Sequence, residues 1–319
     1  MRSWWVRELR WLYALPDRCG PIQMQTVNRR SFLKVTAGAA ASTAFLPHVR
    51  AAAPKRNLRK AIMYSTIGMK GTVLEKFRAM KEAGFEGVEP MGGMDRDEVL
   101  AAFKATGLQA ASVCCHTHWL KPLSAPDEAT RKIGFEGLAH SLRDAQAYSA
   151  TSVLLVPGVA RNGVSYQQCF ERSIVEIRKA IPVAKETGVR IAIENVGNNF
   201  ITSPEQAVEY LDAINSEWVG WHFDIGNAGR VGPAERWIQV LGKRILRIHV
   251  KDYSAKPADP AGSARPKLLD GDTNWSAVMK ALDNAGYSGW AISEQPGNQA
   301  ADVETARDLA QRMDRIFAL

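Results

Sequence analysis

Short apolar runs alternate with longer helical patterns from residue 58 to the end of the chain. Runs such as residues 153–156 and 190–193 are nearly continuous in their apolar character, which is typical of strands covered on both faces in a parallel sheet. Eight such strands are predicted, at residues 61–66, 87–90, 108–115, 152–156, 189–194, 219–224, 245–250 and 290–294.

Each predicted strand is followed by a predicted helix. Ser203 and Pro204 give one clear helix start, with serine as the N-cap and proline at the first helical position. The predicted helices cover residues 73–83, 95–106, 126–149, 166–187, 204–214, 233–241, 275–285 and 302–317, and a glycine directly follows five of them.

Eight strand–helix units in about 260 residues match the (β/α)8 TIM barrel in number and size. The rival fold is a doubly wound open sheet, which usually carries a G-x-G-x-x-G phosphate loop after its first strand. Residues 67–71 read Ile-Gly-Met-Lys-Gly and do not match that loop. The sequence therefore predicts a barrel domain over residues 54–319, preceded by an N-terminal segment of residues 1–53.

The basic excess of the chain lies mostly in that N-terminal segment. Residues 1–53 hold eight of the 41 basic side chains and two of the 33 acidic ones, which leaves a net charge of only +2 for the barrel domain. This balance argues against a nucleic-acid partner. The four cysteines show no spacing that predicts a disulfide framework or a cysteine metal site.

Residues 28–34 read Asn-Arg-Arg-Ser-Phe-Leu-Lys, a modestly apolar stretch follows at 35–46, and Ala51–Ala53 matches an A-x-A cleavage site. Paired arginines before a short apolar region resemble a bacterial twin-arginine signal. The segment therefore predicts export to the periplasm in folded form, with no stable membrane association after export.

Polar residues stand at the ends of four consecutive predicted strands: Glu194, Asp224, His249 and Glu294. Active sites of TIM barrels lie at the carboxyl ends of the strands, so these side chains are expected around one rim. Three converging carboxylates would raise one another's pKa, and a divalent cation removes that conflict. One imidazole with three carboxylates suits Mn2+, Mg2+ or Co2+ better than Zn2+, and Mn2+ is the expected ion.

The segments around these residues resemble the xylose-isomerase-like family of sugar phosphate isomerases and epimerases. The similar segments are Ile-Ala-Ile-Glu-Asn (191–195), His-Phe-Asp-Ile-Gly-Asn (222–227), Arg-Ile-His-Val-Lys-Asp (247–252), Ser-Glu-Gln-Pro (293–296) and Gly-Asp-Thr-Asn-Trp (271–275). The resemblance spans residues 60–317 and implies a TIM barrel.

The resemblance implies that Glu194, Asp224, His249 and Glu294 are metal ligands, and that Glu194 and Glu294 also exchange protons with a carbon next to a carbonyl. A metal-stabilised enediolate would then give epimerisation or aldose–ketose isomerisation. Epimerases of the family often have histidine three positions after the aspartate ligand, where this chain has Asn227. That departure argues against a ketose 3-epimerase in particular.

Further candidates for substrate binding flank the predicted strands. His116 and His118 would share one side if the third strand continued, as hydroxyl ligands or as a second metal site, and Trp119 would stack on a sugar. Glu89 and Asn227 are further candidates to bind a substrate hydroxyl, and Lys251 is a candidate to neutralise an oxyanion. The alternative for Glu89 is a salt bridge, and the alternative for Lys251 is a solvated side chain. His222 is expected deeper in the barrel, as a support for the site.

The sequence thus predicts a periplasmic, metal-dependent isomerase or epimerase that acts on a free sugar or keto sugar. A lyase or hydratase on 3-keto-glycosides is the alternative, because it begins with the same proton abstraction. An endonuclease IV-like repair enzyme and a non-catalytic sugar-binding barrel are less favoured. Members of the family often form homo-oligomers, although the sequence carries no interface signature.

Overall fold

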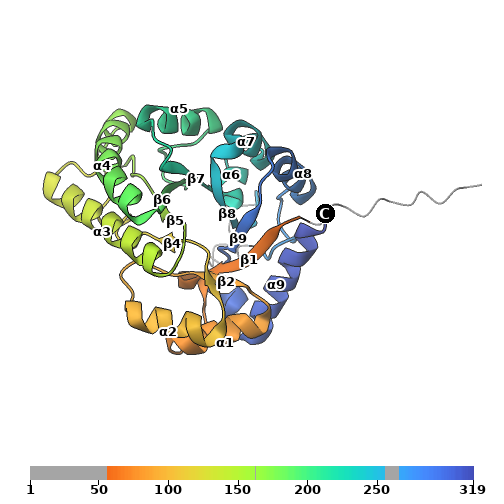
Figure 1. Cartoon of the computed structure of the whole chain (residues 1–319). Coiled ribbons are helices and arrows are strands. Elements are labelled where there is room, and N and C mark those ends of the chain that lie inside the picture. Colours follow the sequence, from red (N-terminus) through yellow and green to blue (C-terminus); the bar gives the residue numbers. More distant parts are fainter. Residues whose placement is uncertain (1–55, 162, 256–265) are drawn as a thin grey trace, which may run out of the picture. The chain divides into compact units, whose positions relative to one another are not determined.

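Parallel strands form a barrel with helices around its outside in the computed structural model of the chain (Figure 1). The structure describes residues 56–161, 163–255 and 266–319. The predicted signal and its boundary at residues 53 and 54 lie outside these residues. The strands are β1 (Leu58–Met63), β2 (Gly87–Glu89), β3 (Gln109–Ala110), β4 (Val113–Cys114), β5 (Ser152–Leu155), β6 (Arg190–Glu194), β7 (Val219–Asp224), β8 (Ile245–Val250) and β9 (Gly289–Ser293).

The predicted third strand, residues 108–115, is divided into β3 and β4. β3 pairs with β2 and β4 pairs with β5, so the sheet order runs β3-β2-β1-β9-β8-β7-β6-β5-β4. A parallel bridge between Met91, which follows β2, and Cys114 of β4 closes the barrel. The fold is therefore the predicted TIM barrel, with one of its eight strand positions interrupted at Ala111 and Ser112, which belong to neither β3 nor β4.

The helices follow the predicted pattern closely. They are α1 (Val73–Ala83), α2 (Arg96–Thr106), α3 (Glu128–Ala147), α4 (Tyr166–Thr187), α5 (Pro204–Ile214), α6 (Ile225–Gly229), α7 (Ala234–Leu241), α8 (Trp275–Ala285) and α9 (Val303–Phe317). The Ser203 side chain accepts a hydrogen bond from the backbone N–H of Gln206 at the start of α5, as its N-cap position predicts. Gly84 ends α1 with a φ of 99°, a left-handed conformation that favours glycine.

Two elements differ from the prediction. β1 covers Leu58–Met63 rather than residues 61–66, and residues 64–66 form a short 3-10 turn. The strand begins on charged residues because Arg59 lies over the Trp290 ring at 3.9 Å and Lys60 pairs with Asp314. The short helix α6 was not predicted, and it begins directly after β7 because Asp224 accepts a hydrogen bond from the backbone N–H of Asn227.

The apolar core has two parts. The larger part packs the helices against the outer face of the barrel, with Phe77, Trp237 and Tyr210 among its fully buried side chains. The smaller part lies inside the barrel and consists of Ala61, Met63, Ala111, Cys114, Leu154, Trp290 and Ile292. The buried polar side chains of Glu89, His222 and His249 also lie within the barrel, so its carboxyl end is lined by titratable groups rather than hydrocarbon.

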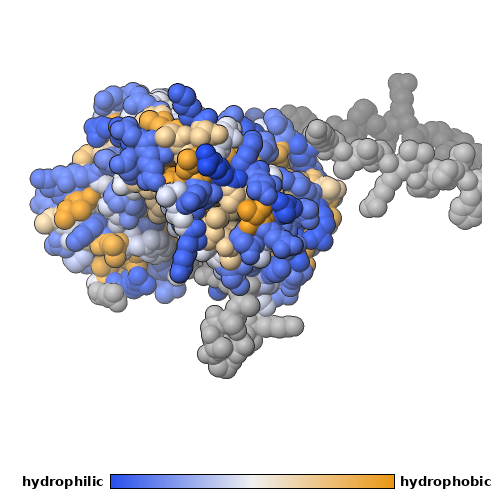
Figure 2. All heavy atoms as spheres, turned by 90° about the horizontal axis from the view of Figure 1, so that it is seen from below, coloured by the Kyte–Doolittle hydropathy of each residue, from blue (hydrophilic) through white to orange (hydrophobic). Residues whose placement is uncertain are grey.

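The surface carries few large apolar side chains. On the face shown in Figure 2, hydrophilic residues predominate and apolar ones form small separate patches. Among the described residues, no helix is long and apolar enough to span a membrane. Among the described residues, Cys114, Cys115 and Cys169 are buried and free.

Candidate metal centre

The barrel brings the four predicted strand-end residues together. Glu194 and Asp224 are the last residues of β6 and β7, His249 lies on β8, and Glu294 directly follows β9. Each of the four offers a ligand atom, and these atoms all lie within 4.8 Å of one another. Asp224 and His249 are fully buried, Glu194 is 6% exposed, and the Glu294 side chain is 24% exposed.

His249 is the centre of this cluster. Its Nδ1 atom lies 3.0 Å from Glu194 Oε1, 3.5 Å from Glu294 Oε2 and 3.7 Å from Asp224 Oδ2. Burial alone would lower the pKa of His249, but the surrounding carboxylates, Glu89 foremost, outweigh burial and hold that pKa well above its usual value. One imidazole nitrogen and three carboxylates therefore face a common point, and this donor set fits a divalent cation.

The two glutamates of the cluster have opposite pKa shifts. Burial raises the pKa of Glu194 to about 7, although His249 opposes the shift. Burial also acts on Glu294, but there the ammonium of Lys251, together with His249 and Asp224, outweighs it and holds the pKa well below the usual range. Two nearby carboxyls with separated pKa values are the arrangement that acid–base chemistry at neutral pH requires.

Lys251 is a buried member of the cluster and not a solvated side chain. It is 4% exposed, its Nζ lies 2.8 Å from Asp224 Oδ2, and it donates a hydrogen bond to Glu294 Oε2. Burial would lower the pKa of Lys251, but Asp224 and Glu294 outweigh it and raise the pKa above its ordinary value. The lysine therefore stays charged beside the two carboxylates.

Asn195 orients Asp224, a role that the sequence prediction did not assign. Asn195 Oδ1 accepts hydrogen bonds from the backbone N–H of Asp224 at 3.0 Å and from Trp221 Nε1 at 3.1 Å, and its Nδ2 donates to the Asp224 carbonyl at 2.8 Å. Asn227 Nδ2 donates to the Asn195 carbonyl at 3.0 Å. Asn195 directly follows the Glu194 of the cluster, so its position in the sequence was the available signal.

A cavity of about 310 Å3 opens onto the cluster. Its lining includes Glu194, Glu294 and four of the predicted substrate ligands. The full set is Met63, Cys114, His118, Trp119, Leu154, Glu194, Val196, Gly197, Asn227, Arg230, Lys251 and Glu294. Several lining residues were not singled out as ligands from the sequence, because their placement depends on the tertiary fold. Met63, Cys114 and Leu154 lie on strands, Val196 and Gly197 follow β6, and Arg230 follows α6.

His118 lines this cavity as a neutral ring. Its Nδ1 accepts a hydrogen bond from the backbone N–H of Val156 at 3.2 Å, and burial, aided by His116, lowers its pKa to about 3. The remaining ring proton is then assigned to Nε2, which makes this atom a hydrogen-bond donor. Trp119 is 45% exposed, and its ring packs edge-on against His118 at a centroid distance of 5.5 Å.

Two predicted ligands lie elsewhere. The chain turns at His116 instead of continuing as a strand, so His116 is exposed, packs against Gly93 and does not share a side with His118. The metal-ligand clusters among the described residues include neither histidine, which leaves the expected second site at this pair without support. Glu89 is fully buried, does not line the cavity, and contacts His249 Nε2 at 3.0 Å.

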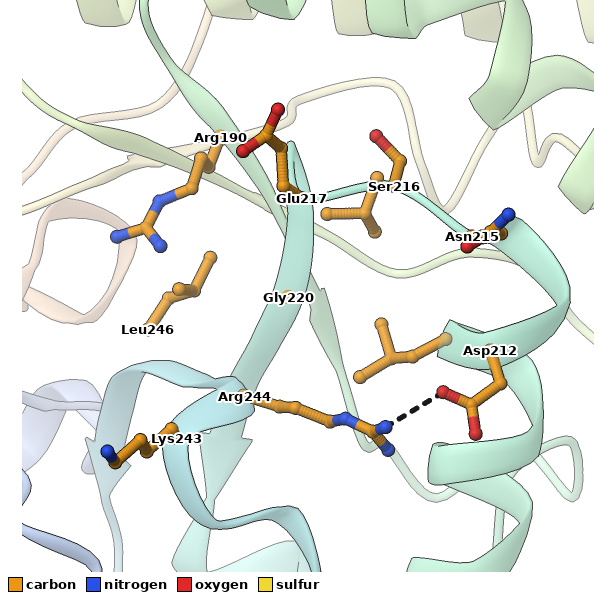
Figure 3. A pocket seen from close by; sticks show the side chains of 11 residues that line it. Arg190, Asp212, Asn215, Ser216, Glu217, Gly220, Lys243, Arg244 and Leu246 are labelled. Carbon is orange, nitrogen blue, oxygen red and sulfur yellow. Dashed lines mark hydrogen bonds and ion pairs between the residues drawn. The ribbon is translucent and has the colours of Figure 1, made fainter.

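A larger cavity of about 440 Å3 lies at the opposite end of the barrel strands (Figure 3). Its lining includes Arg190 at the start of β6, Glu217 just before β7, and Arg244 just before β8. Arg244 is paired with Asp212 at 2.8 Å, as the dashed line in Figure 3 marks. The amino ends of TIM-barrel strands contribute to stability rather than catalysis, so the smaller cavity is the functional candidate.

Comparison with known proteins agrees with this geometry. The model of the family described as "Xylose isomerase-like TIM barrel" matches residues 77–316. An L-ribulose-5-phosphate 3-epimerase of Salmonella paratyphi A is 27% identical over 257 residues, which cover 74% of this chain and 87% of that enzyme.

Two solved structures show the same fold. A 3-keto-D-glucoside 4-epimerase of E. coli, in its apo form, is 18% identical with a TM-score of 0.67, covering 82% of this chain and 100% of that one. The IOLI protein, solved with a bound zinc atom, is 16% identical with a TM-score of 0.68, covering 82% and 98%. The extent of the family match shows that this chain belongs to the xylose isomerase-like TIM barrel family.

Proposed function

We propose that the protein is a divalent-metal-dependent sugar epimerase or isomerase that moves a proton at a carbon next to a carbonyl. The observation that carries the proposal is the pair of Glu194 and Glu294, which line one cavity beside the imidazole of His249. The relative from Salmonella paratyphi A, named as a sugar phosphate 3-epimerase, supports the reaction class. This relative favours a 3-epimerase, whereas Asn227, which stands where many of the family's epimerases have histidine, argues against one.

Glu194, Asp224, His249 and Glu294 would hold the cation. Their oxygen-rich set suits Mn2+, Mg2+ or Co2+, and we propose Mn2+ as the ion used. When bound, such an ion acts as a Lewis acid that polarises the substrate carbonyl and stabilises negative charge on its oxygen.

The two glutamates would perform the proton transfers. Glu294 is kept ionised by Lys251 and is therefore the group that removes a proton. Glu194, which lines the same cavity, would return a proton to the carbon. Transfer to the other face of the same carbon gives an epimer, and transfer to the adjacent carbon gives an isomer.

The cavity wall supplies groups that can orient a small polyol. His118 offers a neutral N–H donor, Trp119 an aromatic face, and Asn227 and Arg230 polar ends. The periplasm, to which the protein would be exported, is poor in free phosphosugars. We therefore propose a free sugar or keto sugar as the substrate. A 3-keto-glycoside is the alternative, since the same proton abstraction can be followed by loss of a leaving group.

Product analysis tests the proposal. The purified protein with Mn2+ would be incubated with ketopentoses, ketohexoses, their phosphates and 3-keto-glucosides, and the products would be read by 13C NMR. We expect a Mn2+-dependent epimer or isomer of one class, abolished by EDTA, whereas an elimination product would select the lyase. Failure to convert any of these compounds, with Mn2+ bound, would count against the proposed function.

We propose further that the protein is exported through the twin-arginine pathway. The motif Arg29-Arg30 before Ser-Phe-Leu-Lys supports this. Replacing both arginines by lysine should retain the protein in the cytoplasm, which cell fractionation would show. Unchanged appearance of the double variant in the periplasm would refute the assignment.

A further inference from the structure

Glu89 ends β2 and lies inside the barrel, where its side chain is fully buried. Its Oε2 atom is 3.0 Å from Nε2 of His249 on β8. In the sheet, β1 and β9 stand between these two strands, so the contact crosses the barrel interior. It joins the single imidazole of the metal centre to a carboxylate outside the predicted ligand set.

The two nitrogens of His249 have different surroundings. Nδ1 faces the meeting point of the three carboxylate ligands, whereas Nε2 faces Glu89. His249 must be neutral to bind a cation, so its imidazole then carries one N–H and the other nitrogen keeps its lone pair. A proton on Nε2, donated to Glu89, leaves the Nδ1 lone pair free for a cation. The other tautomer would set a lone pair against the buried carboxylate and block the cation position with a hydrogen.

Two other roles for Glu89 fit the structure less well. A substrate contact is disfavoured because Glu89 is fully buried and does not line the cavity. A second cation among Glu89, His222 and His249 has the required proximity, since one ligand atom of each lies within 4.8 Å of the others. That cation would have to take Nε2 of His249 while Nδ1 binds the first, which a neutral ring with one N–H does not allow.

We propose that Glu89 is a positioning residue, which holds the Nε2 proton of His249 and thereby directs Nδ1 at the divalent cation. A carboxylate in this place fixes the tautomer and ring orientation and makes the imidazole a stronger ligand. The inference rests on the metal centre of the proposed function, but it concerns metal affinity and tautomer, which are measured without substrate. Loss of turnover and loss of this role can therefore be told apart.

The first test is Mn2+ binding to the full chain by titration calorimetry. Glu89→Gln keeps the size of the side chain and removes its charge, and we expect Mn2+ affinity to fall by about 10- to 100-fold. Glu86→Gln is the matched control, because Glu86 lies just before the same strand and pairs with Arg59 at the surface. The control should bind Mn2+ like the wild type, and circular dichroism should show both variants folded.

The second test needs no variant and remains decisive if Glu89→Gln does not fold. Long-range 15N–1H correlations of the histidine rings, with diamagnetic Mg2+ bound, should report His249 protonated at Nε2. A His249 protonated at Nδ1, two cations bound per chain, or wild-type Mn2+ affinity in folded Glu89→Gln would each overturn the proposal.

Discussion

At the scale of single residues, Lys251 helps to set the charge state of the candidate metal centre. Its ammonium is buried between Asp224 and Glu294, and it holds the pKa of the Glu294 carboxyl low. A surface lysine would be screened by water and would shift that pKa little. Lys251, two residues after His249, is therefore a buried ion-pair partner of Glu294, whereas the sequence left open whether it binds an oxyanion or is solvated.

Replacing Lys251 with methionine should therefore narrow the active pH range. The pKa of Glu294 should rise once its partner is gone, so the protonated, inactive form should dominate at a higher pH. We expect kcat/KM at pH 6 to fall by about 10-fold or more relative to its value at pH 8, where the wild type changes less. Lys267→Met, which removes a surface pair with Asp308, is the control. An acid limb at the same pH in wild type and Lys251→Met would contradict this role.

His118 gives a prediction for stability against acid. Burial lowers its pKa to about 3 in the folded chain, against 6.5 for the free group. The unfolded chain therefore binds the extra proton between these values, and the stability from neutral His118 is full above pH 6.5 and lost as pH falls toward 3. At pH 5 the loss amounts to about 2 kcal/mol at most.

Urea unfolding of wild type and His118→Asn at pH 7 and pH 5 measures that loss directly. The variant should lose less stability than the wild type between the two pH values, because asparagine does not titrate. Equal losses in both proteins would show that His118 does not carry the acid sensitivity.

At the scale of elements, Asp252 connects the site strand β8 to the segment before α8. Its buried carboxylate accepts hydrogen bonds from the backbone N–H groups of Tyr253, Leu269, Gly271 and Thr273 and from Trp275 Nε1. The sequence places Asp252 and residues 271–275 in two separate family-like segments. The structure shows that one carboxylate holds them together.

Asp252→Asn should consequently destabilise the protein by about 1–3 kcal/mol, since an amide offers one acceptor oxygen and turns a donor toward buried N–H groups. Asp270→Asn is a matched control, because Asp270 is 55% exposed and pairs with Arg312 at the surface. The control should change stability little. Thermal unfolding of both variants is the measurement, and equal midpoints would argue against the organising role of Asp252.

The same scale shows what the sequence could predict. Helix starts and ends such as Ser203 and Gly84 depend on neighbouring residues, and these boundaries were correct. The start of β1 was missed because Arg59 and Lys60 look polar until Trp290 and Asp314 are placed beside them. The interruption of the third strand at residues 111 and 112 was missed for a similar reason, since nothing in that apolar run marks it.

The site likewise contains residues that the sequence could place and residues that it could not. Glu194, Asp224, His249 and Glu294 stand at predictable strand ends, so their convergence followed from the barrel. The partner of Glu89 was not predictable, because only the closed barrel brings β2 opposite β8. His116 was placed wrongly beside His118, since its position depended on a strand that ends at Cys114.

At the scale of the whole molecule, the barrel gathers side chains from four consecutive strand positions into one buried cluster, and a cavity opens onto this cluster. The barrel domain is close to neutral, with a net charge of +2, so the positive charge beside the carboxylates is local to Lys251, Arg230 and any bound cation. This arrangement suits proton transfer on a small molecule rather than recognition of an extended polyanion.

Solvent deuterium exchange tests the central claim most directly. The protein with Mn2+ would be incubated in D2O with the sugar that it converts, and NMR would locate any deuterium in substrate and product. We predict Mn2+-dependent incorporation only at carbon next to the carbonyl, lost in Glu294→Gln under conditions where that variant still binds Mn2+. Conversion without deuterium incorporation, or exchange that persists in Glu294→Gln, would contradict the assignment of proton transfer to this site.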